Sequence, residues 1–299
     1  MVAATLAAGA VGVGLGLSRG AAKLDRSEPS SSEDCADCHA PEVEAWKGSR
    51  HAQSRTNDAF EVALRTAATP GWCLNCHEPV AGQDEGVSCA ACHVRDELLA
   101  ASEPSEEAIA AHPIRYSPEL DSPRFCSGCH EFRAADLHGN PDRGGPLQTT
   151  LSEYVDSGVD ATCVECHLEG HAFPGRELLA DVVSVRVEEG RFVVSLVGEV
   201  GHAVPTGDPF RRLELLACED PDCEDVLARH SWSRVHRFDG TTWWPTADNR
   251  LRPDDPVRTW TPPEGTRYWR LQYILVASHD APHLPPEEAV LPLDRGAFP

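Results

Sequence analysis

The sequence predicts a chain of two parts: an N-terminal part of loops and short α-helices arranged around bound cofactors, and a C-terminal antiparallel β part of the sandwich type. Ten of the twelve cysteines lie between residues 35 and 166, grouped in five short motifs. Beyond residue 180, β-branched and polar residues alternate between turn signals, which is typical of antiparallel strands. The 299 residues include 24 prolines and only 6% aromatic residues, so side chains alone supply little core for the cysteine-rich part.

The first 18 residues are apolar, rich in alanine and glycine, and uncharged, and Arg19, Lys23 and Arg26 follow them. We interpret residues 1–26 as an export signal or, if it is not cleaved, as a signal anchor. Residues 27–34 are rich in serine and acidic side chains, which is typical of a flexible linker. This leader predicts a protein on the periplasmic or extracellular side, with residues 1–18 as the candidate membrane anchor.

The net charge of -22 limits the class of partner. Nucleic acid and anionic lipid repel such a surface, so we do not expect a nucleic-acid ligand. The charge suits a basic protein partner. It is equally consistent with an acidic surface that only keeps the protein in solution.

Five copies of the motif C-x-x-C-H lie within residues 35–167, where random placement would yield roughly 0.02 copies in the whole chain. Two thiols three positions apart can form thioethers with the two vinyl groups at one edge of a haem, and the next histidine can then ligate the iron. The sequence therefore predicts five c-type haems. The predicted attachment residues are Cys35, Cys38, Cys73, Cys76, Cys89, Cys92, Cys126, Cys129, Cys163 and Cys166. The predicted proximal iron ligands are His39, His77, His93, His130 and His167.

Paired cysteines have two other common uses, zinc binding and thiol–disulfide exchange. A structural zinc site takes four thiolates from two pairs, but five pairs leave one over, and zinc does not need a histidine after every pair. A thioredoxin-like C-x-x-C normally occurs once, in a βαβ context. The repeated histidine favours haem over both.

We predict a pentahaem domain over residues 35–178, in which the haems themselves form the core. Motifs that begin at Cys73 and Cys89 are only 16 residues apart, so their haems are expected to be neighbours. Helix signals are few. The expected helices are Pro41–Ala52, Glu106–Ala111 and residues 149–157.

We predict a β-rich domain over residues 179–299. Its expected strands are Asp181–Val187, Arg191–Val197, Arg212–Ala217 and Tyr268–Ser278, the first two joined by a turn at residues 188–190. Cys218 and Cys223 flank a turn-forming insert, and in an oxidising compartment we expect them to form a disulfide that closes a hairpin end. Two free thiols are the alternative.

The sixth iron ligand is expected to be histidine. Methionine is the usual alternative, and the chain has only Met1, so low-potential bis-histidine ligation is the default. Spacing alone does not choose among the nine other histidines. They are His51, His112, His138, His171, His202, His230, His236, His279 and His283.

The chain resembles the multihaem cytochrome c family that includes the tetrahaem cytochromes of ammonia-oxidising bacteria. The resemblance covers most of residues 33–216, and it includes the run Trp46, Ser49, His51 and Ala52. The matching segments are CADCHAPEVEAWKGSRHAQS, GVSCAACH, HPIRYSPELDSPRFCSGCHEF, TCVECHLEGHAFPG and GHAVPTGDPFRRLEL.

The resemblance implies that His51 is a distal ligand to a haem attached at another motif. It also implies distal roles for His112, His171 and His202, as in relatives with an appended β domain. One haem then has no assigned partner. His138 is the nearest spare histidine, without a family motif to support it.

Electron transfer between redox proteins outside the cytoplasm is the function these features favour, because closely packed bis-histidine haems need no acid or base. The expected partners are other redox proteins, such as multihaem cytochromes or a quinol-linked membrane complex. The alternative is an oxidoreductase in which one open haem acts on a small nitrogen or sulfur compound. A module that only docks to a membrane complex is a third hypothesis.

Overall fold

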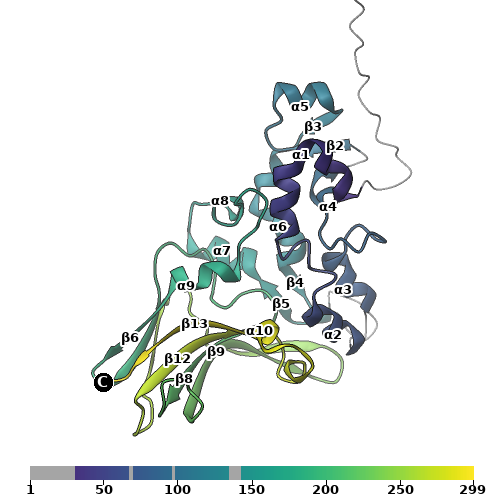
Figure 1. Ribbon diagram of the computed structural model, residues 1–299. Coiled ribbons are helices and arrows are strands. Elements are labelled where there is room, and N and C mark those ends of the chain that lie inside the picture. Colours follow the sequence, from purple (N-terminus) through teal and green to yellow (C-terminus); the bar gives the residue numbers. More distant parts are fainter. Residues whose placement is uncertain (1–30, 67–69, 96–97, 135–142) are drawn as a thin grey trace, which may run out of the picture.

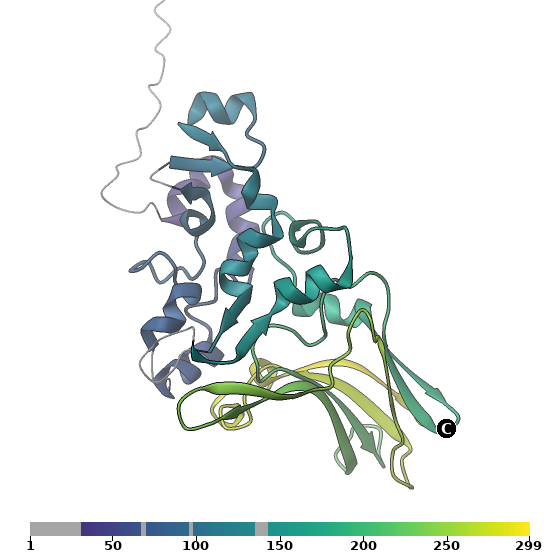
Figure 2. The same ribbon diagram turned by 180° about the vertical axis from the view of Figure 1, so that it is seen from behind.

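The computed structural model describes residues 31–66, 70–95, 98–134 and 143–299. Figure 1 shows short helices and loops gathered over one side of a set of antiparallel sheets, and Figure 2 shows the same arrangement from behind. The predicted fold class, loops and short helices followed by an antiparallel sandwich, is confirmed. The candidate anchor, residues 1–18, lies outside the described residues. Within the described ranges, no helix is both long and apolar enough to cross a bilayer.

The N-terminal part contains eight α-helices among its described residues, and all except the first have nine residues or fewer. They are α1 (Ser32–Lys47), α2 (Asp58–Thr66), α3 (Pro70–His77), α4 (Cys89–His93), α5 (Glu106–Ala111), α6 (Pro123–His130), α7 (Thr150–Ser157) and α8 (Cys163–His167). Two small sheets connect them. The strands are β1 (Val94–Arg95), β2 (Leu98–Ala101) and β3 (Ile114–Tyr116) in one, and β4 (Glu131–Arg133) and β5 (Pro146–Thr149) in the other. A 3-10 turn, η1 (Pro118–Asp121), precedes α6.

Two of the three expected helices lie where the sequence places them, as α5 and α7. The helix expected over Pro41–Ala52 corresponds to the part of α1 that follows a break in the helix at His39, and only its expected end is wrong. The part of α1 before the break begins at Ser32, because Ser31 and Asp34 cap its first turn reciprocally, so residues 32–34 of the expected linker are helical. The whole of α1 spans Ser32–Lys47. It ends at Lys47, with Gly48 as its C-cap, and His51 therefore lies in the turn that follows the helix.

The C-terminal part is a sandwich of two antiparallel sheets. The larger has the order β10-β9-β8-β12-β13, and the smaller has the order β11-β7-β6. Their strands are β6 (Val183–Glu188), β7 (Arg191–Leu196), β8 (Arg212–Cys218), β9 (Val226–Phe238), β10 (Trp243–Asp248), β11 (Val257–Trp260), β12 (Tyr268–Ile274) and β13 (Val290–Ala297). Short helical turns connect or precede them: η3 (Arg176–Leu178), α9 (Leu179–Val182), η4 (Ala281–His283) and α10 (Pro286–Ala289).

The core of the sandwich comes from the inward-facing residues of both sheets. Phe192 of β7 packs with Leu213 and Leu215 of β8 and Leu271 of β12, and all four are fully buried. Alternation along these strands places one side chain in two toward the core. The β6–β7 hairpin closes through Glu189 and Gly190, both with positive φ, as a two-residue turn of matching twist requires.

The helical part is joined to the sandwich by a second, smaller apolar contact. Ala59 and Val62 of α2 pack against Val276, Leu284 and Ala289 of the β part. This contact brings α2 onto one end of the larger sheet, where Figure 1 shows α2 beside α10. The two parts therefore share a buried boundary.

Candidate haem-binding centre

Each of the five C-x-x-C-H motifs lies at the end of a short helix or at a break in one. Helices α3, α4, α6 and α8 all end at the motif histidine. In α1 the backbone leaves helical geometry at His39 (φ −116°, ψ 40°), two residues before Pro41. A helical turn places residues three apart on the same side, so each motif presents two thiols together and an imidazole directly after them.

Backbone carbonyls orient three of the motif imidazoles. The Nδ1 atom of His77 lies 2.9 Å from the Ser54 carbonyl oxygen, that of His93 lies 2.9 Å from Ala100 O, and that of His167 lies 2.7 Å from Pro174 O. An Nδ1–H that donates to a carbonyl leaves the lone pair on Nε2. Three rings are therefore held in the tautomer that a metal ligand uses.

Four of the five motif histidines face a second histidine at nearly one spacing. The distances between ring centroids are 6.2 Å for His39 and His112, 6.3 Å for His130 and His51, 6.1 Å for His93 and His171, and 6.1 Å for His167 and His202. The four partners are the residues that the family resemblance selected. His230, His236, His279 and His283 are not part of these pairs.

The spacing fits two imidazoles on opposite sides of one iron atom. Metal–nitrogen bonds of about 2.0 Å, with about 1.1 Å from each nitrogen to its ring centre, would separate the ring centres by about 6.2 Å. Direct stacking of two rings would bring them closer, as Phe60 and His77 show at 3.9 Å. The gap within each histidine pair therefore has the width of a metal centre with its two axial bonds.

His77 has a different environment from the other four motif histidines. Its ring stacks against Phe60 of α2 with an interplanar angle of 6°. Within the described residues, no second histidine ring lies at the common spacing from His77. His138, the spare histidine considered from the sequence, lies outside the described residues.

His51 is held by a turn that the segment before α4 braces. Its carbonyl oxygen accepts from the Val87 N–H at 2.9 Å, and the Trp46 indole N–H donates to Val87 O at 2.8 Å. Gly86 has φ +69°, and a Cβ there would lie 2.4 Å from the His51 carbonyl oxygen. Trp46 and a glycine at 86 are therefore both needed to bring the turn of His51 against this segment.

His112 and His171 also occupy helix ends and turns. His112 is the C-cap of α5, and its backbone N–H donates to Ala108 O at 2.9 Å. His171 has φ +75°, a strained conformation for a residue with a side chain. Its ring meets Phe173 edge-on at 6.1 Å, and Phe173 in turn meets His51 edge-on at 4.7 Å. Phe173 thus separates two of the histidine pairs.

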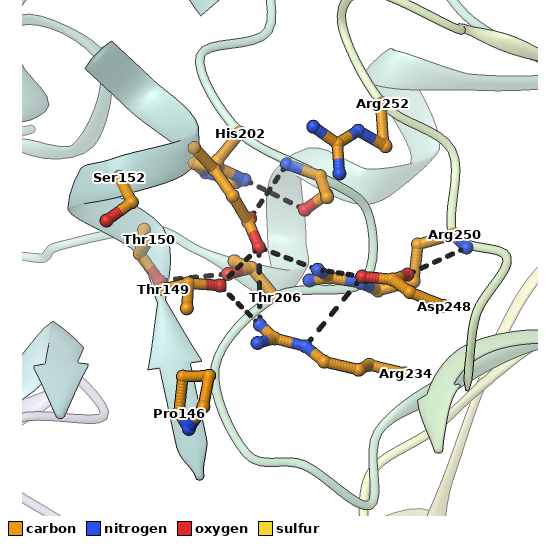
Figure 3. Close-up of polar contacts among 12 residues, drawn as sticks. Pro146, Thr149, Thr150, Ser152, His202, Thr206, Arg234, Asp248, Arg250 and Arg252 are labelled. Carbon is orange, nitrogen blue, oxygen red and sulfur yellow. Dashed lines mark hydrogen bonds and ion pairs between the residues drawn. The ribbon is translucent and has the colours of Figure 1, made fainter. Parts of the chain in front are cut away.

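His202 is presented by a loop of the β part that a buried carboxylate holds in place (Figure 3). Glu153 of α7 accepts the Ala203 N–H at 3.1 Å through Oε2. On the other side, Thr150 and Thr206 hydroxyls lie 2.9 Å apart. The loop next to His202 is thereby attached to α7 from both directions.

Two arginines from the sandwich compensate the charge of Glu153. Arg250 donates to Glu153 Oε1 at 2.6 Å, and Arg234 donates to the same oxygen at 3.2 Å. Asp248 pairs with both arginines, at 2.7 Å from Arg250 and 3.8 Å from Arg234. Glu153 and Arg250 are buried, with 9% and 3% of their surface exposed, so they form a compensated ionic cluster between α7 and the sandwich.

Thiols of different motifs lie next to one another. Cys35 hydrogen-bonds with Cys89, Cys76 with Cys129, and Cys126 with Cys163. Cys92 is close enough to Cys126 and Cys129 for their charges to interact. The motif on α6 is therefore central, beside the motifs on α3, α4 and α8. Within the described part of the chain, no three histidine, cysteine or acidic side chains converge as a metal-binding group.

Comparisons with known proteins find similar chains among the c-type cytochromes. The family model for cytochrome c554 and c-prime matches residues 34–97. The cytochrome c-type protein NrfB of Escherichia coli O6:H1 is 24% identical over 159 residues, which are 47% of this chain and 67% of that protein. The crystal structure of a penta-heme cytochrome c552 from Thermochromatium tepidum superposes with a TM-score of 0.69 at 21% identity, covering 90% of this chain and 98% of that one.

The chain is similar to multihaem cytochromes c in sequence and in fold. This similarity supports c-type haem as its cofactor and electron transfer as its function. The neighbour of solved structure spans the added C-terminal β part as well, since the match covers 90% of the chain. None of these comparisons favours the oxidoreductase alternative.

Burial keeps several imidazoles of the cytochrome neutral. Burial lowers the pKa of His130 to about 4, and the nearby positive charges of His51 and Arg211 add to the effect. Burial likewise lowers the pKa of His51, His171 and His202. A neutral imidazole keeps the lone pair that a metal requires, so these sites suit ligation at neutral pH.

Sequence reasoning missed the residues that hold the histidine loops. Glu153, Arg234 and Arg250 carry no motif and are 81 to 97 positions apart in their pairings, so no local pattern could indicate them. The disulfide expected at Cys218 and Cys223 is present, with a Cα–Cα distance of 5.1 Å, and it closes the connection between β8 and β9.

Proposed function

We propose that the cytochrome carries five haems, one at each C-x-x-C-H motif, and serves as an electron carrier between redox partners outside the cytoplasm. The four histidine pairs at a common spacing of 6.1–6.3 Å carry this proposal. The similar protein from Thermochromatium tepidum is described as penta-heme, which supports the count.

Ligand roles follow from the pairs. The motif histidines His39, His77, His93, His130 and His167 are the proximal ligands, and the ten motif cysteines form the thioethers. His112, His51, His171 and His202 are the distal ligands facing His39, His130, His93 and His167, in that order. His51 thus belongs to the haem attached at α6 although it follows the motif of α1.

The bound haems supply reversible one-electron chemistry, and the chain's own residues keep the imidazoles fixed while the charge changes. Backbone carbonyls hold three proximal rings, and turns braced by Trp46, Gly86 and Glu153 hold two distal ones. We assign residues 35–178 to the haem domain and 179–299 to the β domain. The β domain takes part in haem binding because His202 belongs to it.

Redox partners of this cytochrome are other proteins, including multihaem cytochromes or a quinol-linked membrane complex. The net charge of -22 favours a partner with a basic docking surface, so exchange should be faster at low salt. Two outcomes together would instead support the oxidoreductase. They are a spectral change in one haem when the reduced protein is titrated with carbon monoxide, and steady turnover of nitrite or hydroxylamine.

Purified protein is expected to contain five haems per chain. Every motif presents both thiols and the histidine, so none lacks the attachment set. A pyridine haemochrome assay, combined with the intact mass of the polypeptide, measures the count. A count of three or fewer, or bound zinc, would contradict haem attachment at all five motifs.

Replacement of a distal histidine should convert one haem from low-spin to high-spin without loss of haem. His51→Ala and His202→Ala remove the rings that face His130 and His167, while the thioethers remain. His279→Ala is the matched control, because His279 is exposed and outside the pairs. Electron paramagnetic resonance counts the high-spin haem. Spectra of both variants that match the control would refute the ligand assignment.

A further inference from the structure

Arg211 is a cation without a carboxylate partner at the boundary of the two parts. It precedes β8, and its Nε is fully buried without a hydrogen-bond partner. Its Nη1 lies 3.5 Å from the Thr206 carbonyl oxygen, and the Tyr273 hydroxyl hydrogen-bonds with the guanidinium. Within the described residues, no carboxylate reaches ion-pair distance of Arg211, although the charge of Asp208 acts on it.

The neighbouring arginines have the carboxylate partners that Arg211 lacks. Arg211, Arg234 and Arg250 line one small pocket together with residues of the loop 205–209. Arg234 and Arg250 each pair with Glu153 and Asp248. A buried guanidinium without such a partner is costly, because burial removes water from the charge and no carboxylate of the described residues pairs with it in place of the water.

Packing holds the Arg211 guanidinium in place. Gly207 has φ +85°, and a Cβ at that position would lie 2.7 Å from Arg211 Nη1. The loop backbone therefore lies directly on the guanidinium, and any larger residue at 207 would displace it. Tyr273, 3% exposed, supports it from β12. A side chain held so closely, with its Nε–H unused, indicates a fixed acceptor in the loaded protein.

The charge of Arg211 reaches two motif histidines at once. Its guanidinium is close enough to His77, on α3, and to His130, on α6, for the charge to act on both imidazoles. The same two motifs share the contact between Cys76 and Cys129. Arg211 thus lies where the haems attached at α3 and α6 would come together.

We infer that Arg211 binds a propionate carboxylate of a haem attached at α3 or α6, and that it raises the reduction potential of that haem. The inference rests on the proposed function, since it requires haem at these motifs. A haem propionate is the anion that haem loading would bring to this boundary, and an arginine fork matches a carboxylate well. A fixed positive charge disfavours the oxidised, more positive haem, so it raises the potential.

Arg211→Gln in the full-length holoprotein tests this role. We expect haem content and low-spin spectra to stay unchanged, while the midpoint potential of one haem falls by at least 59 mV, a tenfold change in a one-electron equilibrium. That potential should also become pH-dependent near neutral pH, because a propionate without its cation protonates more easily. Arg211→Lys keeps the charge and should restore most of the potential.

Arg212→Gln is the matched control, because Arg212 is the next residue along the chain and its partner is Glu214 at 3.7 Å. The double variant of His51→Ala and Arg211→Gln shows which haem supplies the propionate. If the haem with the lowered potential is the one that His51→Ala makes high-spin, the partner of Arg211 is the haem of α6. If it is another haem, the partner is the haem of α3. Unchanged potentials in Arg211→Gln, with five haems present, overturn the inference and leave the proposed function intact. Should Arg211→Gln not fold, Tyr273→Phe removes the hydroxyl that holds the guanidinium and supplies the readout, and wild-type potentials in that variant overturn the inference.

Discussion

Glu153→Ala is expected to lower the free energy of unfolding by about 3–5 kcal/mol and to make one haem high-spin. The substitution leaves Arg234 and Arg250 buried beside one carboxylate, Asp248, instead of two. It also removes the acceptor of the Ala203 N–H, which fixes the loop next to His202. Urea denaturation measures the first effect, and electron paramagnetic resonance measures the second.

Two further variants separate charge from loop anchoring. Glu153→Gln removes the charge but keeps an oxygen for the Ala203 N–H, so it should destabilise the protein while His202 stays in place. Asp156→Ala on the same helix is the control. Its side chain is exposed, and a change of at most about 0.5 kcal/mol is expected. Equal stability of Glu153→Ala and Asp156→Ala would show that the ionic cluster does not hold the two parts together.

Gly86→Ala should release His51 from the haem of α6. A Cβ at residue 86 would lie 2.4 Å from His51 O, 2.6 Å from Ser54 Oγ and 2.7 Å from Ala52 O. Two of these atoms are backbone carbonyls that cannot rotate away, so the turn must move. We expect about 1–3 kcal/mol from the overlap, in addition to about 1 kcal/mol or more from the positive φ.

Gly82→Ala is the matched control for this experiment. Gly82 has φ +88°, but a Cβ there would meet nothing within 4 Å. Both variants carry the backbone strain, and only Gly86→Ala carries the overlap. A new high-spin signal in Gly86→Ala alone is the expected result. The same low-spin spectrum in both would mean that the contact between Gly86 and the turn of His51 does not position the imidazole.

Haem attachment could be predicted from the sequence because its chemistry requires contiguous residues. Two thiols and an imidazole must reach one haem from one helical turn, so the five motifs are visible as spacing. The facing histidines obey no such rule. His51 lies 79 residues before His130, and His202 lies 35 residues after His167. Only the family resemblance selected them.

Long-range packing decides which motifs are neighbours and forms the strands that the sequence did not predict. The spacing of Cys73 and Cys89 predicted neighbouring sites, whereas the described thiol contacts join Cys89 to Cys35 and Cys76 to Cys129. Strands β6, β7, β8 and β12 were expected because their buried faces are rich in apolar residues. Strands β9, β10, β11 and β13 were not, because large parts of them are exposed and mix charged residues with apolar ones.

The central place of the α6 motif has a consequence for how many partners the molecule can serve at once. Five centres in a single row have two ends, whereas a row that forks at its third member has three. The contacts from α1 to α4, from α4 to α6, and from α6 to both α3 and α8 describe the forked form. At two of the three ends, on α1 and α8, the motif cysteines Cys38 and Cys166 are exposed at the surface. Such an arrangement would accept electrons at one end and pass them to either of the other two. Loss of one end would leave electron transfer between the remaining two ends intact.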